Sequence, residues 1–415
     1  MKMKNLPKGW EIKKLGEICK IVNGFAFKSS DFKDFGIPIV KIANVGYSEF
    51  KTKDQQYVDE SFLKVNTNVI INPGDILFAL TRPITNDTTK VCKFPNTYSV
   101  ALLNQRVCSI REFNREIESE YVYWYFQSID FKNYIKTKFS ETLQPNLSPK
   151  DLSLTLIPLP PLETQQRIVA KIEELFSELD KGVEELKKTQ EQLKTYRQSV
   201  LKWAFEGRFT NENVKDGVLP EGWEWKRLGS IFNFIGGGTP SKNESSFWNG
   251  NIPWASIKDI KGSYLTQTSD YITEEGLKNS TTNLALNGEL IVATRINPGR
   301  PIITKIDTTI NQDLKIARSK VALDIKFGYY YFLSCENEIL KKSSGTTVLG
   351  IRLEILNDLE IIYPPIEEQH QIVQEIESRL SVADKLQEQI KTSLQQAEAL
   401  RQSILKKAFE GELVR

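Results

Sequence analysis

The sequence of 415 residues contains only one histidine, His370. Hydrolases that activate a serine or cysteine nucleophile commonly use a histidine base, so such chemistry would depend on this single residue. His370 falls at the start of a long stretch with helical periodicity, which favours a solvated helix residue. The scarcity of histidine therefore argues against a hydrolase of this type.

Cysteine is also scarce, and its positions follow no metal-binding or disulfide pattern. The four cysteines are Cys19, Cys92, Cys108 and Cys335. They form no CxxC pair, so we expect neither a zinc site nor a disulfide framework. The glycine-rich run at 236–241 lacks the spacing of a nucleotide-binding loop, and Pro240 removes an amide donor, which favours a turn. We therefore assign no catalytic, cofactor-binding or metal-binding residue to the chain.

Long hydrophobic runs are absent from the sequence. No run approaches the ~18 apolar residues of a membrane helix, and the lysine-rich N-terminus is unlike a signal peptide. Together with the scattered cysteines, these features predict a cytoplasmic protein. The formal net charge of +2 neither requires nor excludes nucleic acid, so DNA binding would depend on local patches.

The sequence does contain an internal repeat. The segment Leu-Pro-x-Gly-Trp at 6–10 returns at 219–223, an offset of 213 residues. The segment Ala-Phe-Glu-Gly at 204–207 returns at 408–411, an offset of 204, so the second copy is nine residues shorter. The ends of the copies match while their centres have diverged. A duplicated frame with different centres suits a protein that presents two different recognition surfaces.

Four segments follow from this repeat. Residues 1–158 and 210–362, which we name domain 1 and domain 2, are rich in β-branched and aromatic residues with frequent Gly, Pro and Asn breaks. This composition predicts short strands, for example at 37–42 and 75–80. Residues 159–209 and 363–415 are predicted to be helical regions. We therefore predict an α+β protein with two globular mixed α/β domains and two long helices.

Each helical region carries an apolar stripe of coiled-coil type, because apolar residues recur mostly at steps of three and four. The stripe of the first helix comprises Ile168, Ile172, Leu175, Leu179, Leu186, Leu193 and Val200. The stripe of the second comprises Ile372, Ile376, Leu380, Leu386, Ile390, Leu394, Leu400 and Ile404. Exposed stripes are penalised by water at ~25 cal/mol per Å². We expect an intramolecular antiparallel coiled coil with pseudo-twofold symmetry, and a homodimerising coil is the alternative.

The order of domain, helix, domain and helix resembles the specificity (S) subunit of type I DNA restriction-modification systems. The resemblance rests on the doubled Leu-Pro-x-Gly-Trp and Ala-Phe-Glu-Gly segments and on Pro-Pro-Leu/Ile-Glu-x-Gln at 160–165 and 364–369. Shorter similar segments include Gly-Phe-Ala-Phe-Lys at 24–28 and Gln-Pro-Asn-Leu at 144–147. Residues 344–349 depart from the family, because the second copy lacks the Gln-Pro-Asn of the first.

The resemblance implies a role without catalysis. Each domain would be a target recognition domain that reads one half of a bipartite, asymmetric double-stranded DNA site. The helices would set the spacing and dock methyltransferase (M) subunits, two of them by expectation. Restriction (R) subunits would join for cleavage, and S-adenosylmethionine, ATP and Mg would bind to partner subunits. A coiled-coil scaffold that binds protein partners instead of DNA is the alternative function.

Candidate DNA contacts lie in polar loops of each domain, since Arg and Lys suit guanine, Asn and Gln suit adenine, and Thr suits phosphate. The first candidates follow a strand in each copy, at 81–90 and 294–300: Arg82, Asn86, Thr88, Lys90, Arg295, Asn297 and Arg300. The second candidates follow a helix, at 140–146 and 341–347: Gln144, Asn146, Thr346 and Thr347. We expect the first loops to project from a sheet. Solvated surface is the alternative for all of them.

Two further groups of residues favour structural roles. The Asn-Gln pairs at 104–105 and 311–312 sit between apolar runs, which favours buried hydrogen bonds over adenine recognition. The aromatic runs at 121–126 and 329–332 have helical spacing, which favours core packing over base stacking.

Overall fold

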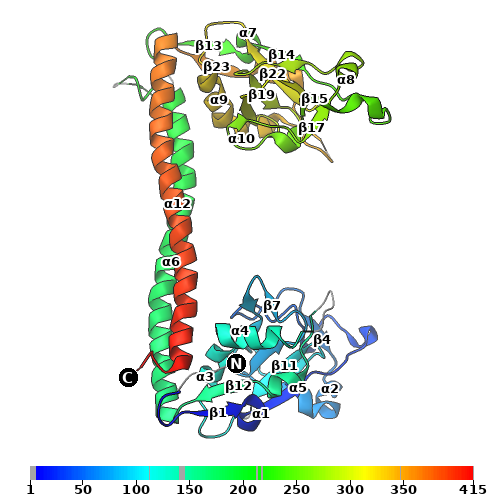
Figure 1. The fold of residues 1–415 in the computed structure, drawn as a ribbon, viewed down its shortest axis with the longest axis vertical. Helices are drawn as coiled ribbons and strands as arrows, with labels where there is room; N and C mark the ends of the chain where they lie inside the picture. The colour runs from blue at the N-terminus through cyan, green and yellow to red at the C-terminus, as the bar shows by residue number, and fades with distance from the viewer. Residues whose placement is uncertain are drawn as a thin grey trace. The chain divides into compact units, whose positions relative to one another are not determined.

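The computed structural model describes residues 6–111, 113–139, 145–211, 214–215, 218–345 and 347–414. The chain divides into two compact units (Figure 1). Unit 1 comprises Met1–Leu186 and Thr392–Arg415, and unit 2 comprises Lys187–Lys391. Each unit contains one globular domain and a part of both long helices, α6 (Leu162–Phe205) and α12 (Ile366–Glu410).

Domain 1 is built on two four-stranded sheets with the orders β2-β11-β6-β9 and β4-β3-β10-β5. Their strands are β2 (Lys20–Asn23), β11 (Val107–Arg111), β6 (Ile76–Ala79), β9 (Val91–Lys93), β4 (Gln56–Val58), β3 (Ile37–Val40), β10 (Ala101–Leu103) and β5 (Ile70–Ile71). The other elements are β1 (Glu11–Lys14), α1 (Leu15–Ile18), η1 (Ser29–Asp31), α2 (Ser61–Val65), η2 (Thr67–Val69), β7 (Ile84–Thr85), β8 (Thr88–Thr89), α3 (Ser119–Tyr125), α4 (Ile129–Lys136), α5 (Pro149–Ser153) and β12 (Leu156–Leu159).

Domain 2 repeats this topology, with the orders β14-β22-β19-β20-β16 and β17-β15-β21-β18. Its sheet strands are β14 (Phe232–Gly236), β22 (Leu314–Ser319), β19 (Leu290–Ala293), β20 (Pro301–Thr304), β16 (Tyr264–Leu265), β17 (Asp270–Ile272), β15 (Trp248–Ala255), β21 (Thr308–Ile310) and β18 (Leu284–Ala285). The other elements are β13 (Glu224–Arg227), α7 (Leu228–Ile231), η3 (Ser245–Phe247), η4 (Ile257–Asp259), α8 (Glu274–Lys278), α9 (Ile325–Ser334), α10 (Glu336–Lys342), α11 (Leu353–Asp358) and β23 (Glu360–Tyr363). Among the described residues, strand β16 has no counterpart in the sheets of domain 1, and the β7–β8 hairpin has none among the strands of domain 2.

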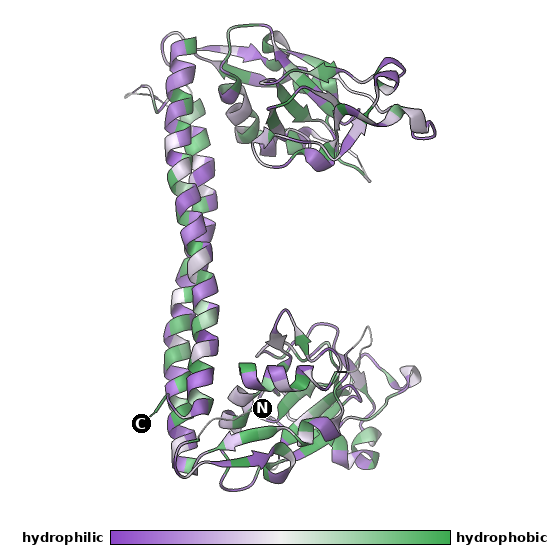
Figure 2. Ribbon diagram, in the orientation of Figure 1, coloured by the Kyte–Doolittle hydropathy of each residue, from purple (hydrophilic) through white to green (hydrophobic). Residues whose placement is uncertain are grey.

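The strand β6 lies between two hydrophobic cores of domain 1. All four of its residues are buried, and their side chains alternate between two cores. Ile76 and Phe78 pack with α3, α4 and the long helices, whereas Leu77 and Ala79 pack in the core shared with the second sheet. A continuous apolar run is what a strand covered on both faces requires. Figure 2 shows hydrophobic residues concentrated in the central strands of each domain, and the strands expected within 37–42 and 75–80 are confirmed.

The long helices pair with each other inside both units. In unit 1, Ile168 and Ile172 near the start of α6 share a core with Ile404 near the end of α12. In unit 2, Val200 near the end of α6 shares a core with Ile372 near the start of α12. The helices therefore run antiparallel within each unit. The intramolecular pairing is confirmed, and the homodimerising coil is not needed to bury the stripes.

The apolar stripe is covered unevenly. Ile168, Ile172, Leu193, Val200, Ile372, Ile376, Ile390 and Ile404 are buried, and Leu175, Leu179, Leu186, Leu380 and Leu394 are half-buried. The expectation was wrong for Leu400, which is 51% exposed, because Leu405 and Arg401 occupy the facing side of that turn. Arg401 lies 4.4 Å from the Phe176 ring and forms an ion pair with Asp180. Leu386 is also exposed (38%), since a pair of helices alone leaves the flank of its seam open to water.

The repeated Pro-Pro-x-Glu-x-Gln segment fastens each domain to its helix. Gln165 is buried, its Oε1 accepts from the backbone N–H of Glu118 at 2.9 Å, and its Nε2 donates to the carbonyl of Pro160 at 2.8 Å. Gln369 makes the same two bonds, to the N–H of Asp324 (3.0 Å) and the carbonyl of Pro364 (2.9 Å). Each glutamine satisfies backbone groups that would otherwise be buried without a partner.

The other repeated segments meet at the ends of the long helices. Gly207 and Gly411 both have φ of 77°, in the left-handed region that favours glycine. A Cβ at Gly207 would lie 2.6 Å from Pro220 Cγ, and one at Gly411 would lie 2.3 Å from Pro7 Cγ. The Ala-Phe-Glu-Gly and Leu-Pro-x-Gly-Trp segments are therefore packed on each other in both units. None of the helices in the described ranges is long and apolar enough to cross a membrane.

Candidate nucleic-acid interface

In domain 1, residues 145–147, at the described end of the second candidate loop, lie beside the first candidate loop at 81–90, although more than fifty residues separate them in the sequence. The backbone N–H of Arg82 donates to the carbonyl of Pro145 at 2.8 Å, and that of Leu147 donates to Leu80 at 2.8 Å. The turn between β10 and β11 joins them, because Leu80 N–H donates to the Arg106 carbonyl at 3.0 Å. Gln144 lies outside the described residues.

Domain 2 brings the same three segments together. The N–H of Ile296 donates to Leu349 at 2.8 Å, and that of Thr294 donates to Asp313 at 2.8 Å. We name these surfaces the loop ends. The loop end of domain 1 comprises residues 80–90, 104–106 and 145–147, and that of domain 2 comprises residues 294–300, 311–313, 344–345 and 347–351. Asn146 and Thr347 are exposed within them, and Thr346 lies outside the described residues.

In the sequence, Thr81-Arg82 looks equivalent to Thr294-Arg295, but the backbone hydrogen bonds show a different correspondence. The matched hydrogen bonds make Arg82 equivalent to Ile296, and both have a left-handed φ, 49° and 70°. Thr81, which pairs with Asn146, is then equivalent to Arg295, which pairs with Gly350. A shift of one residue along a strand moves a side chain to the opposite face. Arg82 and Arg295 are therefore not counterparts.

The first loop of domain 1 forms a hairpin, β7–β8, whose tip is docked on α4. Asn86 and Asp87 occupy the turn with φ of 49° and 57°, the pattern of a type I′ turn. The carboxylate of Asp87 accepts from Lys136 at 2.8 Å and lies 3.7 Å from the Nζ of the buried Lys132. These lysines hold the pKa of Asp87 below its usual value. The hairpin tip is thus fastened to the domain, while Asn86 and Thr88 remain exposed and Lys90 is half-buried.

The corresponding loop of domain 2 is four residues shorter, seven against eleven between the flanking strands. Pro298 and Gly299 are buried, and a Cβ at Gly299 would lie 2.7 Å from Ile339 of α10. The loop is therefore packed down and does not project as expected. Asn297 is exposed and Arg300 is half-buried.

The charges at the two loop ends differ. In domain 2, the Nη1 of Arg295 lies 3.2 Å from the Oδ1 of Asp313. In domain 1, the place of Asp313 is taken by Arg106, which is exposed. Within the described parts of the chain, the Arg82 and Arg106 side chains make no hydrogen bond or ion pair. The sequence did not suggest Arg106 or Asp313 as candidates, although each directly follows one of the Asn-Gln pairs at 104–105 and 311–312.

The Asn-Gln pairs met the expectation only in part. Asn311 is buried and its Nδ2 donates to Asp313 at 3.0 Å, as predicted for a structural hydrogen bond. The expectation was wrong for Gln105 and Gln312, which are exposed because they sit at the crest of a turn between strands. The preceding loop approaches this turn closely, since a Cβ at Gly24 or Gly237 would lie 2.1 Å from the carbonyl oxygen of Asn104 or Asn311.

The aromatic runs form core, as expected. Tyr121 and Tyr125 are buried, and their hydroxyls donate to the carbonyls of Pro158 (2.7 Å) and Leu156 (2.6 Å). Burial raises the pKa of both phenols. Tyr331 makes the equivalent bond to the Glu360 carbonyl in domain 2. The side chain of His370 is 58% exposed on α12, which confirms its reading as a surface residue.

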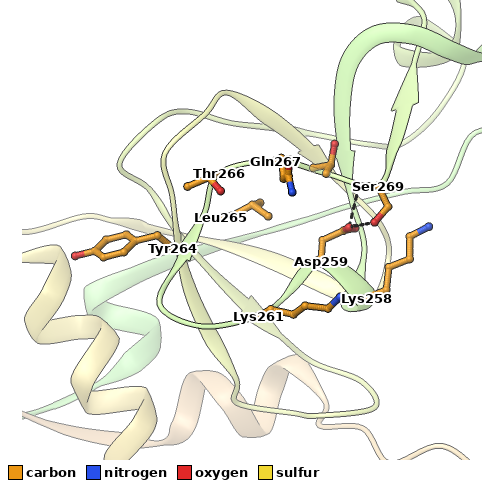
Figure 3. A pocket seen from close by; sticks show the side chains of 9 residues that line it. Lys258, Asp259, Lys261, Tyr264, Leu265, Thr266, Gln267 and Ser269 are labelled. Carbon is orange, nitrogen blue, oxygen red and sulfur yellow. Dashed lines mark hydrogen bonds between the residues drawn. The ribbon is translucent and has the colours of Figure 1, made fainter. Parts of the chain in front are cut away.

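A polar cavity of about 340 Å³ in domain 2 was not anticipated (Figure 3). It is lined by Lys258, Asp259, Lys261 and Tyr264, among others. Burial alone would raise the pKa of Asp259, but bonds from Ser256 and Ser269 outweigh it and the pKa is lowered. Lys258 is paired with Asp270 at 2.6 Å. Lys258 and Asp259 are therefore held by bonds to neighbouring residues. In the sequence, only the Lys-Asp-Ile-Lys segment at 258–261 indicated this charged site.

Comparison with known proteins shows which family this architecture resembles. A family model described as the type I restriction modification DNA specificity domain matches residues 7–191 and 220–396. The chain is 28% identical over 432 aligned residues to the specificity subunit of the type I restriction enzyme EcoBI of Escherichia coli, covering 96% of this chain and 85% of that protein.

Two solved structures share the fold. A chain from a study of complex assembly and conformational transition of the type I R-M system has a TM-score of 0.79 and 24% identity, with 99% of this chain and 100% of that chain covered. The HsdS subunit from Thermoanaerobacter tengcongensis has a TM-score of 0.59 and 23% identity, with 99% of each chain covered. With the duplicated match over most of its length, the chain belongs to the family of type I restriction-modification DNA specificity subunits.

Proposed function

We propose that each domain reads one half of a bipartite, asymmetric DNA site within a type I restriction-modification complex. The observation that carries this proposal is the contrast between a repeated frame and divergent loop ends. The strand orders, the glutamine fastenings and the packed end segments recur in both copies. The charged residues at the loop ends do not recur, so the two surfaces suit different sequences.

The loop ends supply side chains with the chemistry of DNA recognition. Arg82 and Arg106 are exposed, and no side-chain bond in the described chain occupies them, so they are available to phosphates or guanines. Asn86 and Asn297 are exposed amides of the kind that pairs with adenine. We propose that these residues, with Thr88, Lys90, Arg300 and Thr347, contact the half-site of their own domain.

We propose that α6 and α12 set the spacing between the half-sites and dock the methyltransferase subunits. The helices contain 44 and 45 residues without a break, and each extends through both units. At ~1.5 Å per residue, a continuous helix of this length fixes a distance that a flexible linker would not. We propose that partner subunits bind on the exposed polar faces of the pair.

In this proposal the chain contributes recognition and no chemistry. Methyl transfer and its S-adenosylmethionine would belong to two M subunits, and ATP-driven cleavage with Mg would belong to R subunits. Such a division explains why the candidate residues are hydrogen-bond donors and acceptors at loop ends and not a set of aligned acid, base and nucleophile.

The test is to co-express the full chain with its M subunit and to sequence the modified bases of the host DNA. The expected result is one asymmetric motif with two specified halves and an unread spacer. Binding of the complex to that motif should weaken steeply as salt rises, because phosphate contacts release counterions. A coiled-coil scaffold that binds only protein would leave no motif and would show no salt-dependent DNA binding.

A further inference from the structure

We infer that Arg295 reads a guanine in the half-site of domain 2 and that Asp313 is the positioning residue that orients it; this inference rests on the proposed function. Arg295 follows β19 at the loop end, and its side chain is 52% exposed. Its Nη1 donates to the Oδ1 of Asp313 at 3.2 Å. An exposed arginine with one fixed contact has both the access and the orientation that a base reader requires.

Asp313 itself is not free to read a base. Its side chain is only 13% exposed. The Oδ1 accepts from Arg295, and the Oδ2 accepts from Asn311 Nδ2 at 3.0 Å. Its backbone N–H donates to the Oδ1 of Asn311 at 3.1 Å, so Asp313 is held from two directions. A rigid carboxylate of this kind can orient the guanidinium that contacts it.

The aliphatic stem of Arg295 is held as well. Arg295 pairs with Gly350 across an antiparallel bridge, and a Cβ at Gly350 would lie 3.3 Å from Arg295 Cγ. With stem and one nitrogen fixed, the other N–H groups of the planar guanidinium remain to donate in parallel. Two parallel donors match the O6 and N7 acceptors of guanine in the major groove.

At the matching positions of domain 1, all of them among the described residues, no such pair occurs. Thr81 stands where domain 2 has Arg295, and Arg106 stands where domain 2 has Asp313. The inferred guanine contact is therefore a property of one half-site. It also differs from the pair that holds the far end of the same strands, Arg318 with Glu289, which recurs in domain 1 as Arg111 with Asp75. The recurring pair serves the fold, and the unrepeated pair is available for specificity.

The experiment uses the full chain co-expressed with its M subunit, with sequencing of the modified bases. Asp313→Asn keeps the shape of the side chain and removes its charge, and Arg295→Lys keeps the charge and removes the planar fork. Each should relax the same single G·C position in the half-site of domain 2, by about 5- to 150-fold, and leave the other half unchanged. That half-site is identified as the one lost when domain 2 is replaced.

Glu289→Gln is the matched control, because it breaks an Arg–carboxylate pair between the same two strands. It should lower the melting temperature without changing the motif. An unchanged motif with Arg295→Lys, or equal loss at both halves, would overturn the inference. So would a domain 2 half-site without a G·C pair. If Asp313→Asn prevents folding, the Arg295→Lys variant alone tests the inference, because Arg295 is exposed. Absence of any bipartite motif with the unaltered chain would instead refute the proposed function.

Discussion

One central strand pair occurs in both domains, and the charged residues at one of its ends recur while those at the other end differ. Strands β6 and β11 in domain 1 and β19 and β22 in domain 2 pair antiparallel in the same register. At one end both domains carry an arginine and a carboxylate, Arg111 with Asp75 and Arg318 with Glu289. At the other end, Arg106 of domain 1 occupies the position that Asp313 occupies in domain 2.

The difference separates the pair that recurs in both domains from the residues that we propose contact DNA. Arg111 and Arg318 also donate to backbone carbonyls of β5 and β18, so each ties the two sheets of its domain together. Any copy of the fold needs that tie. Within the described chain, the charged side chains at the loop end of domain 1 make no bond that ties its two sheets together. At this one matched position the charge is reversed, from Arg106 in domain 1 to Asp313 in domain 2.

The largest expected effect is loss of both half-sites together. A two-residue insertion after Leu186 and after Ile390 would rotate each apolar stripe by ~200° and remove the contacts that pair α6 with α12. Methylation should cease entirely. A matched four-residue insertion adds ~6 Å and nearly preserves the phase of the stripe, so it should lengthen the unread spacer by one or two base pairs.

The readout of the insertions is the motif modified by each variant with its M subunit. The four-residue variant serves as the control for chain length, since both half-sites should survive in it. An active four-residue variant with an unaltered spacer would rule out the helices as a ruler, and would favour helices that only dock partners.

The next largest effect, a change of the modified motif, is expected when the two domains are made identical. Replacing residues 210–362 with a second copy of 1–158 keeps the topology, the entry segment and the register of the first sheet. Both loop ends would then carry Arg82 and Arg106, and the modified motif should become palindromic. A motif that stays asymmetric after this exchange would mean that the domains do not read the half-sites separately.

The sequence predicted the frame far better than the loop ends, and the reason is physical. Apolar periodicity reports burial, so the coiled-coil stripes and the aromatic cores were visible in advance. The exceptions, Leu386 and Leu400, lie where a two-helix pair cannot cover every apolar residue. Loops of unequal length carry no such signal. The two Thr-Arg pairs look matched, yet backbone bonding shifts them by one residue.

A moderate effect is expected from the unpaired arginines of domain 1. Arg106 has no side-chain partner in the described chain to orient it, so we expect it to contact phosphate and not to specify a base. Arg106→Ala should weaken binding of the complex several-fold at all sequences and lower the salt slope by about one. Arg82→Ala should behave similarly. Titration of labelled DNA at several salt concentrations gives the slope, and a changed base preference in the domain 1 half-site would contradict the assignment.

The smallest expected effect concerns the arginine–carboxylate pairs that both domains share, Arg318 with Glu289 and Arg111 with Asp75. We expect these two pairs to stabilise their domains to different extents. Glu289 accepts from both Arg318 and the N–H of Leu286; burial alone would raise its pKa, but these bonds outweigh it and the pKa is lowered. Burial raises the pKa of Asp75, whose contact with Arg111 is looser at 3.6 Å. Glu289→Gln should therefore destabilise domain 2 by about 1–2 kcal/mol, and Asp75→Asn should cost domain 1 less.

The pH dependence follows from the same directions. A lowered pKa in the folded state means that the contribution of Glu289 is fully present above its unfolded pKa of about 4.3 and is lost as the pH falls through the folded value. Thermal melts of the two variants at pH 7 and near pH 4 would show this. The deficit of Glu289→Gln should shrink at the lower pH, whereas Asp75→Asn should show no such loss. Equal deficits for the two variants at both pH values would mean that the shared pairs hold both domains alike.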